Sequence, residues 1–181
     1  MPARPTISIE DFVADSPTVA TISPGAPIDE PRLIEGVVLT SLTSGADHRG
    51  SLSELLTTRD GLDDPIVHVY QVFANPGSVR AWVFHRLQDD RLAFTNGRLR
   101  VVLYDLRPDS PTYGQLDILD LGEDRPCLLR IPVFVAHGIE NTGDTVASFI
   151  NMPTRVYDPE RPDKSRLPAD HPGIPYTFRK G

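Results

Sequence analysis

Hydrophobic and polar positions alternate over short stretches along most of this chain, and these stretches are rich in β-branched and aromatic residues. Turn pairs such as Asn96-Gly97 and Thr142-Gly143 separate them, as in antiparallel hairpins. Apart from a weak N-terminal segment, no 3.6-residue spacing indicates a helix. The pattern therefore predicts an all-β antiparallel sandwich or barrel. The expected strands span residues 34–42, 51–56, 65–73, 78–86, 91–95, 98–106, 115–121, 126–132, 135–141 and 146–152.

Two histidine-bearing segments resemble the two sequence motifs of the cupin jelly roll. In the second segment, Pro132 lies five residues before His137 and Asn141 four residues after it, with Phe134 at the position of the motif's glycine. The first motif corresponds to residues 77–97, which begin and end with glycine. The order and separation of the two segments agree with a cupin jelly-roll barrel.

The length of 181 residues suits one domain with a core that needs no disulfides. We predict that the jelly roll occupies residues 33–152. Residues 1–32 are expected to form an irregular N-terminal arm. Residues 153–181 are rich in proline and glycine, and we expect them to form a C-terminal tail that wraps the sheet.

Charge and composition narrow the classes of partner. The formal net charge is −7 and no block of Lys and Arg occurs, which argues against a nucleic-acid-binding surface. Cys127 is the only cysteine, so neither a disulfide framework nor a thiolate metal cluster is expected. No apolar run approaches the ~20 residues of a membrane span, and the first residues lack a signal-peptide core. We expect a soluble, cytoplasmic protein with a small-molecule partner.

Five segments in order resemble the dTDP-4-dehydrorhamnose 3,5-epimerase family. The most specific motif is "YDLRPDSPTYG", which ends the segment "VRAWVFHRLQDDRLAFTNGRLRVVLYDLRPDSPTYG". The other four segments are "DHRGSLSEL", "IPVFVAHGIEN", "NMPTRVYDPERPDKSRLP" and "HPGIPYTF". The resemblance implies a jelly-roll fold, a nucleotide-linked sugar as substrate, and a site without metal or cofactor. It also implies a homodimer, in which a second subunit would cover exposed sheet edges.

The chain departs from this family at the positions that transfer protons. A family histidine removes a proton beside a ketone, and a family tyrosine donates one to the opposite face. The resemblance places Val83 at the histidine position and Asn151 at the tyrosine position, so the usual reaction is not expected in its usual form. A family lysine falls near Asp90, with Arg91 adjacent. Asp170 matches the carboxylate that orients the family's histidine.

Other polar residues remain near these positions. His85 projects to the same face of its strand as Val83, about 7 Å further along, and could act as a relocated base. His137 and Asp105 match family positions at the barrel mouth. We predict that His85, His137 and Asp105 are catalytic, and that the two histidines share a cavity with Arg80 and Asp105 near its rim or wall. The residues predicted to bind substrate are Arg49, Glu54, Arg80, Arg91 and Asn151, because guanidinium groups suit phosphate and the positions match the family.

These residues favour an isomerase, or a related cyclase or dehydratase, that moves a proton beside the carbonyl of a nucleotide-linked keto-sugar or a related biosynthetic metabolite. Two alternatives stay open. One is a metal-dependent cupin enzyme that uses His85, Asp89 or Asp90, and His137. The other is a non-catalytic protein that binds a sugar nucleotide or another small molecule. The tyrosines that could supply an acid are Tyr70, Tyr104 and Tyr157, each of which could equally be a packing residue.

Overall fold

A computed structural model describes residues 25–28, 32–57 and 64–179 of the chain. All regular structure in these residues is β-strand, which confirms the predicted all-β class. The strands are β1 (Val38–Ser41), β2 (Thr43–Asp47), β3 (Gly50–Glu54), β4 (Tyr70–Ala74), β5 (Val79–Phe84), β6 (Asp90–Asn96), β7 (Arg98–Asp105), β8 (Leu116–Gly122), β9 (Cys127–Ile131), β10 (Val135–Asn141), β11 (Ala147–Asn151) and β12 (Ser165–Arg166). No helix in the described ranges has the length and apolar character needed to cross a membrane.

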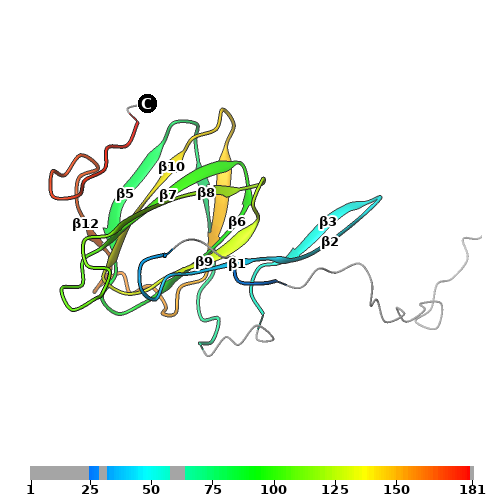
Figure 1. Ribbon diagram of the computed structural model, residues 1–181. Coiled ribbons are helices and arrows are strands. Elements are labelled where there is room, and N and C mark those ends of the chain that lie inside the picture. The colour runs from blue at the N-terminus through cyan, green and yellow to red at the C-terminus, as the bar shows by residue number, and fades with distance from the viewer. Residues whose placement is uncertain (1–24, 29–31, 58–63, 180–181) are drawn as a thin grey trace, which may run out of the picture.

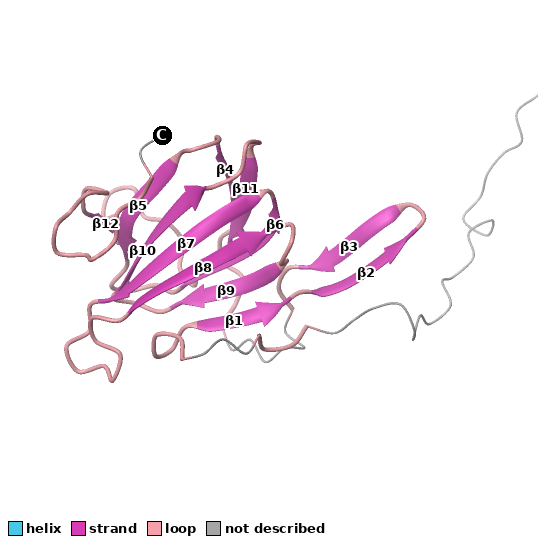
Figure 2. Cartoon of the chain, turned by 45° about the horizontal axis from the view of Figure 1, so that its top comes forward, coloured by secondary structure: helices cyan, strands magenta, loops and turns pink. Residues whose placement is uncertain are grey.

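Two antiparallel five-stranded sheets face each other and form the predicted jelly-roll barrel (Figures 1 and 2). One sheet has the order β1-β9-β6-β11-β4, and the other has the order β12-β5-β10-β7-β8. Strands distant in sequence are therefore neighbours, and β10 lies between β5 and β7. This arrangement brings both histidine-bearing segments of the sequence into one sheet.

The main hydrophobic core fills the space between the two sheets. Side chains alternate across each strand, so that every second residue of β7 and of β10 joins this core. Examples are Leu99, Val101 and Leu103 of β7, with Val135 and Ile139 of β10, all at most 5% exposed. His137 occupies the position between the last two, so the alternation turns its side chain inward.

The C-terminal segment covers the outer face of the second sheet. Ile174 and Phe178 pack there against Trp82 of β5, and the Trp82 indole Nε1 donates a hydrogen bond to the carbonyl of Ala169. A Cβ atom at Gly138 would lie 2.4 Å from Cζ of Phe178, so this close approach requires glycine. Both faces of β10 are therefore buried.

Each of the ten predicted strand segments contains or overlaps an observed strand. The predicted turn at Asn96-Gly97 joins β6 to β7, with Gly97 at a φ of +71°. Two strands, β2 and β12, were not predicted. The first contains the weak strand formers Gly45 and Asp47, and the second is a two-residue strand in a polar, proline-rich segment.

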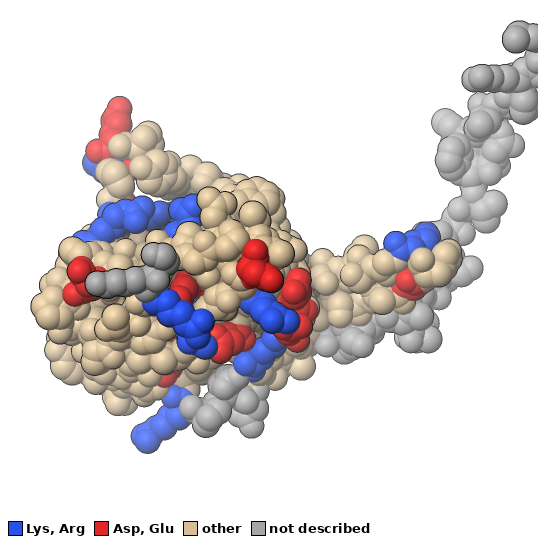
Figure 3. Space-filling model, turned by 90° about the horizontal axis from the view of Figure 1, so that it is seen from above, with Lys and Arg blue, Asp and Glu red and all other residues tan. Residues whose placement is uncertain are grey.

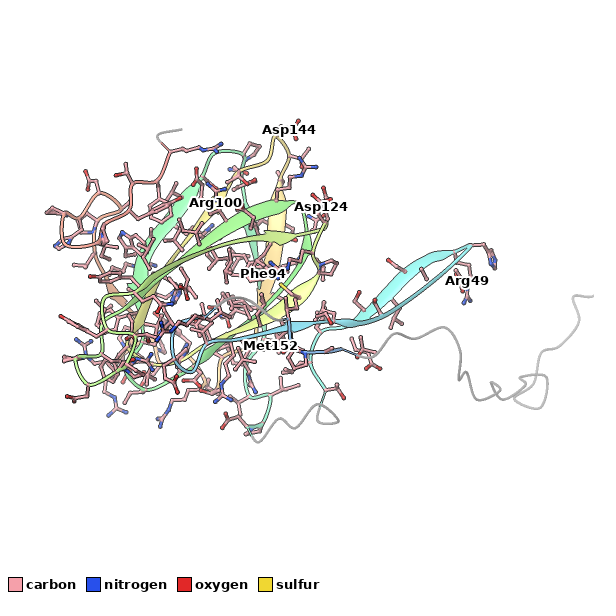
Figure 4. The ribbon with its side chains drawn as sticks, viewed as in Figure 1. Arg49, Phe94, Arg100, Asp124, Asp144 and Met152 are labelled. Atoms are coloured by element: carbon pink, nitrogen blue, oxygen red, sulfur yellow. The ribbon has the colours of Figure 1, made fainter. Side chains whose placement is uncertain are left out.

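The hairpin of β2 and β3 extends away from the barrel, and Figure 4 shows Arg49 near its far end, whereas Phe94 lies inside the barrel. The predicted N-terminal arm, residues 1–32, lies almost entirely outside the described residues.

Candidate active site

A cavity of about 370 Å³ opens between the two sheets. The second sheet contributes Val83 of β5, His85 immediately after β5, and His137 of β10. The first sheet contributes Tyr70 of β4, Asp90 of β6 and Asn151 of β11. The other lining residues are Val72, Val79, Arg80, Ala81, Leu92, Ile139, Phe149, Lys164 and Arg166. Histidines therefore face a carboxylate, an amide and a phenol across the cavity.

The two histidines converge on one carboxylate oxygen. Nε2 of His85 lies 3.4 Å from Oδ2 of Asp90, and Nε2 of His137 lies 3.5 Å from the same oxygen. The imidazole rings are stacked, with centroids 6.1 Å apart and planes inclined by 26°. Val83 is paired directly with His137 across β5 and β10, so the valine lies beside this group without adding a polar atom to it.

Asp90 is held in its ionised form although it is almost fully buried. Burial alone would raise the pKa of its carboxyl, but interactions with His85, His137 and Asn151 outweigh burial and hold the pKa well below its usual range. Burial lowers the pKa of His137 to about 4, a larger effect than the opposing one of Asp90. His137 is therefore neutral at pH 7, and the Asn151 amide donates a hydrogen bond to the Asp90 carboxylate.

Asn151 connects the carboxylate to a tyrosine. Its Nδ2 donates hydrogen bonds to Oδ1 of Asp90 at 3.1 Å and to the hydroxyl oxygen of Tyr70 at 2.8 Å. Burial and the negative charge of Asp90 raise the pKa of Tyr70, and the hydrogen bond from Asn151 opposes them in part. The phenol therefore stays protonated at neutral pH.

The C-terminal segment completes the cavity with residues that the sequence analysis did not single out. Oδ2 of Asp163 lies 3.4 Å from Nδ1 of His85, and the same carboxylate accepts hydrogen bonds from the backbone N–H groups of Arg86 and Leu87. Lys164 follows Asp163 and lines the cavity. Partial burial lowers the pKa of Lys164, and nearby positive charge adds to this effect. No periodic pattern marks this segment, so pairing of β12 with β5 is the feature that places these residues.

A second, larger cavity of about 720 Å³ adjoins the first. Tyr70, His85 and Lys164 line both cavities and therefore lie where the two cavities adjoin. The larger cavity also carries Arg155 and Arg161 together with the carboxylates of Asp158 and Asp163, and Arg161 pairs with Asp158. Its apolar wall includes Val67, Leu87, Pro153 and Val156.

Positive side chains are concentrated around the two cavities. Arg80, Lys164 and Arg166 line the smaller one, which holds a single carboxylate, Asp90. On the face seen in Figure 3, basic and acidic side chains are intermixed. The cavities are thus a local environment for an anionic ligand.

Four of the predicted site residues line the smaller cavity. His85 and His137 face the same cavity, and Arg80 lines it while donating a hydrogen bond to the carbonyl of Phe73. Asn151 also lines this cavity. Their functional roles stay predictions.

The prediction that Asp105 lies near the cavity is wrong. Asp105 is fully buried at the end of β7 and does not line either cavity. Its carboxylate accepts hydrogen bonds from the guanidinium and backbone N–H of Arg107 and from the hydroxyls of Ser110 and Thr112. All of these donors come from the turn after β7, so the carboxylate orders this turn.

The prediction that Arg91 contacts substrate is also not supported, because Arg91 points to the opposite face of β6 from Asp90. It is 1% exposed, and its guanidinium donates hydrogen bonds to the carbonyls of Met152, Asp64 and Pro65. These bonds tie the loop before β4 to the end of β11, which is a structural role.

Arg49 and Glu54 lie on the hairpin and do not line either cavity of their own chain. Arg49 is exposed and its guanidinium pairs with Asp47.

Asp170, which the family resemblance matches to the carboxylate that orients the histidine, is exposed. The carboxylate next to His85 is instead that of Asp163.

One group of side chains in the described residues has the composition of a metal site. Single ligand atoms of His85, Asp90 and His137 all lie within 4.8 Å of one another, and two histidines with one carboxylate form a set that divalent transition metals use. Asp89, the other predicted carboxylate, is not part of it. Its side chain pairs with Arg130 and accepts a hydrogen bond from the backbone of Val133.

Comparison with known proteins places this chain in a family. The profile of the family dTDP-4-dehydrorhamnose 3,5-epimerase matches residues 31–178. The spore coat polysaccharide biosynthesis protein SpsL of Bacillus subtilis is 38% identical over 146 residues, which cover 81% of this chain and 97% of that protein. A probable low-salt glycan biosynthesis epimerase of Haloferax volcanii is 40% identical over 142 residues, covering 76% and 89% of the two chains.

Solved structures agree with this placement. The dTDP sugar isomerase of Desulfovibrio desulfuricans G20 is 33% identical with a TM-score of 0.75, covering 80% of this chain and 92% of that one. The dTDP-4-dehydrorhamnose 3,5-epimerase of Bacillus anthracis, solved with TDP and pyrophosphate bound, shares the fold with a TM-score of 0.75 at 19% identity, covering 87% of this chain and 92% of that one. The chain therefore belongs to the dTDP-4-dehydrorhamnose 3,5-epimerase family of sugar isomerases.

Proposed function

We propose that this protein epimerises a nucleotide-linked keto-sugar by transferring a proton at a carbon next to the carbonyl. The observation that carries the proposal is the placement of His85 in a cavity between two carboxylates, Asp90 and Asp163. Such an environment suits a base that must hold a proton briefly, because both carboxylates stabilise the imidazolium that proton abstraction creates.

His85 is the proposed base in place of the residue at position 83. Asp163 lies 3.4 Å from Nδ1, and in this proposal it holds the tautomer that carries hydrogen there, so that the lone pair of Nε2 accepts a proton from substrate. Asp90 faces Nε2 and stabilises the proton once it has been taken. In this proposal His137, which is neutral at pH 7, offers a hydrogen bond to the substrate instead of a charge.

The positive side chains support an anionic substrate. A nucleoside diphosphate carrier would occupy the larger cavity beside Arg155 and Arg161, with its sugar ring in the smaller cavity. The reacting carbon would then lie where the two cavities adjoin, near Tyr70, His85 and Lys164. Lys164 is placed to attract the negative charge of an enolate oxygen.

Arg49 and Glu54 fit a role in substrate binding only through a second subunit. Their hairpin extends away from its own barrel, so the predicted contacts would be made in the cavity of a partner chain (Figure 1). The homodimer implied by the family resemblance stays a prediction.

The direct test is hydrogen exchange with solvent. When the protein is incubated with dTDP-4-keto-6-deoxyglucose in D₂O, we expect deuterium to enter a position next to the ketone, because abstraction and return of the proton pass through His85. Mass spectrometry and proton NMR would locate the label. Binding of the nucleotide sugar without any exchange would contradict the proposed reaction and favour a non-catalytic binding protein.

A metal-dependent reaction is a second candidate, favoured by the convergence of His85, Asp90 and His137. A bound ion would occupy Nε2 of His85 and prevent it from accepting a proton. We expect exchange activity to survive dialysis against EDTA unchanged, since the proposed base needs a free nitrogen. Loss of activity after dialysis, with recovery on adding Mn²⁺, Fe²⁺ or Zn²⁺, would instead support the metal-dependent reaction.

A further inference from the structure

Tyr70 lines both cavities and is hydrogen-bonded to Asn151 on the neighbouring strand. The two residues lie directly opposite each other in the antiparallel pairing of β4 with β11, and the Asn151 amide reaches the tyrosine hydroxyl at 2.8 Å. Tyr70 is half-buried and lines both cavities. A phenol hydroxyl is therefore present beside Asn151, although it belongs to the neighbouring strand.

The hydrogen bonds fix the direction in which the phenol can donate. The Asp90 carboxylate is ionised and can only accept, so the atom of Asn151 that faces it must be the amide nitrogen. The same nitrogen donates to the Tyr70 oxygen, so that the tyrosine's own proton takes no part in this bond. Among the described residues no hydrogen bond uses that proton, which leaves it available to a molecule in the cavity.

Tyr70 and His85 also come from opposite sides of the cavity. His85 follows β5 of one sheet, whereas Tyr70 begins β4 of the facing sheet. Inversion of a carbon next to a carbonyl requires that the proton leave one face of the planar enolate and arrive at the other. We propose that Tyr70 is the catalytic acid that donates a proton to the enolate on the face opposite His85.

This inference rests on the proposed function, and its proton transfers balance. The C–H bond next to the carbonyl breaks, Nε2 of His85 takes the proton, and the electron pair moves to the carbonyl oxygen. The Tyr70 O–H bond then breaks, and its proton forms the new C–H bond on the other face as the carbonyl is restored. The tyrosinate keeps the hydrogen bond from Asn151, which stabilises its charge.

The proton balance is restored between turnovers. Both Tyr70 and His85 line the larger cavity, so water there can remove the proton from His85 and return one to Tyr70. The burial and the neighbouring carboxylate that raise the pKa of Tyr70 keep this phenol in the acid form that the step requires.

The test is Tyr70→Phe, which removes the hydroxyl and keeps the ring. With dTDP-4-keto-6-deoxyglucose in D₂O, the wild-type chain should produce labelled epimer. The variant should form epimer at least about 100-fold more slowly, the effect expected on losing a positioned acid. It should still exchange deuterium into substrate of unchanged configuration, because His85 can remove and return a proton on one face. Tyr113→Phe, on the exposed loop after β7, should behave as wild type.

The outcomes separate this inference from the proposed function. Wild-type epimer formation by the Tyr70→Phe variant would overturn the role of Tyr70 alone, as would equal loss of exchange and epimerisation. Absence of exchange in the wild-type chain would overturn the proposed function and this inference with it. If Tyr70→Phe folds poorly, 3-fluorotyrosine at position 70 provides a second test. The more acidic phenol should shift the alkaline limb of epimerisation to lower pH, and an unchanged limb would count against the proposal.

Discussion

Replacing His85 with glutamine is expected to slow deuterium exchange next to the substrate ketone by about 10²- to 10⁴-fold, the usual contribution of a positioned general base. Glutamine retains a polar side chain of similar reach but cannot accept a proton at neutral pH. The large effect is expected because position 83, two residues earlier on the same face, is valine and offers no substitute. His137, the other histidine of the cavity, is a poor substitute because burial lowers its pKa to about 4.

The measurement is the rate of label incorporation at saturating substrate, followed by proton NMR. His171→Gln is a matched control, because His171 lies in the C-terminal segment outside both cavities, where its Nδ1 accepts a hydrogen bond from the backbone N–H of Gly173. It should leave the exchange rate unchanged. If His85→Gln exchanges as fast as the wild-type chain, the base is another group, and the roles proposed for His85 and for Asp163 beside it are wrong.

The strands and the shared face of Val83 and His85 could be predicted because they depend on alternation along a single strand, and the inward placement of His137 was predicted from the cupin motif. His85 follows Val83 by two residues, which is one repeat of a strand. His137 lies midway between Val135 and Ile139 of β10, whose side chains join the core between the sheets. Local pattern is sufficient for such residues. It does not say which strands are neighbours, and the register that places Val83 opposite His137 is a property of the assembled sheet.

Alternation along β6 would have corrected the prediction that Arg91 binds substrate. Asp90 points into the cavity, so Arg91 must point to the other face of β6, where backbone carbonyls surround it. Asp163 and Lys164 could not be predicted in this way. They lie in a polar segment without periodicity, and their approach to His85 depends on the tertiary pairing of β12 with β5.

Asp105 shows how a recognisable motif can carry a structural role. Arg107, Ser110 and Thr112 follow it at positions two, five and seven, and each donates to its carboxylate. Aspartate followed closely by hydroxyl residues and arginine is typical of a turn that satisfies its own hydrogen bonds. This signal was present in the sequence, but the family resemblance favoured a catalytic role.

Replacing Asp105 with alanine is therefore expected to destabilise the fold by about 3 kcal/mol, because the change leaves several partly buried donors without their acceptor. Asp105→Asn should cost less, since the amide keeps the shape and one acceptor oxygen. Hydrogen bonds from Arg107, Ser110 and Thr112 hold the pKa of Asp105 well below its usual range against the effect of burial. A depressed pKa contributes stability above the unfolded value of about 4, and this contribution is lost as the pH falls toward the folded value.

The wild-type chain and Asp105→Asn should differ by a constant free energy of unfolding from about pH 5 to 7. This difference should shrink as the pH is lowered from about 5 toward 2. Urea denaturation at a series of pH values measures it. The folded Asp105→Asn protein should exchange substrate deuterium at the wild-type rate, because this carboxylate lines neither cavity. A variant with wild-type stability but no exchange would show that Asp105 acts in catalysis after all. The structure argues against that role, because all five hydrogen bonds of this carboxylate come from the turn that follows its own strand.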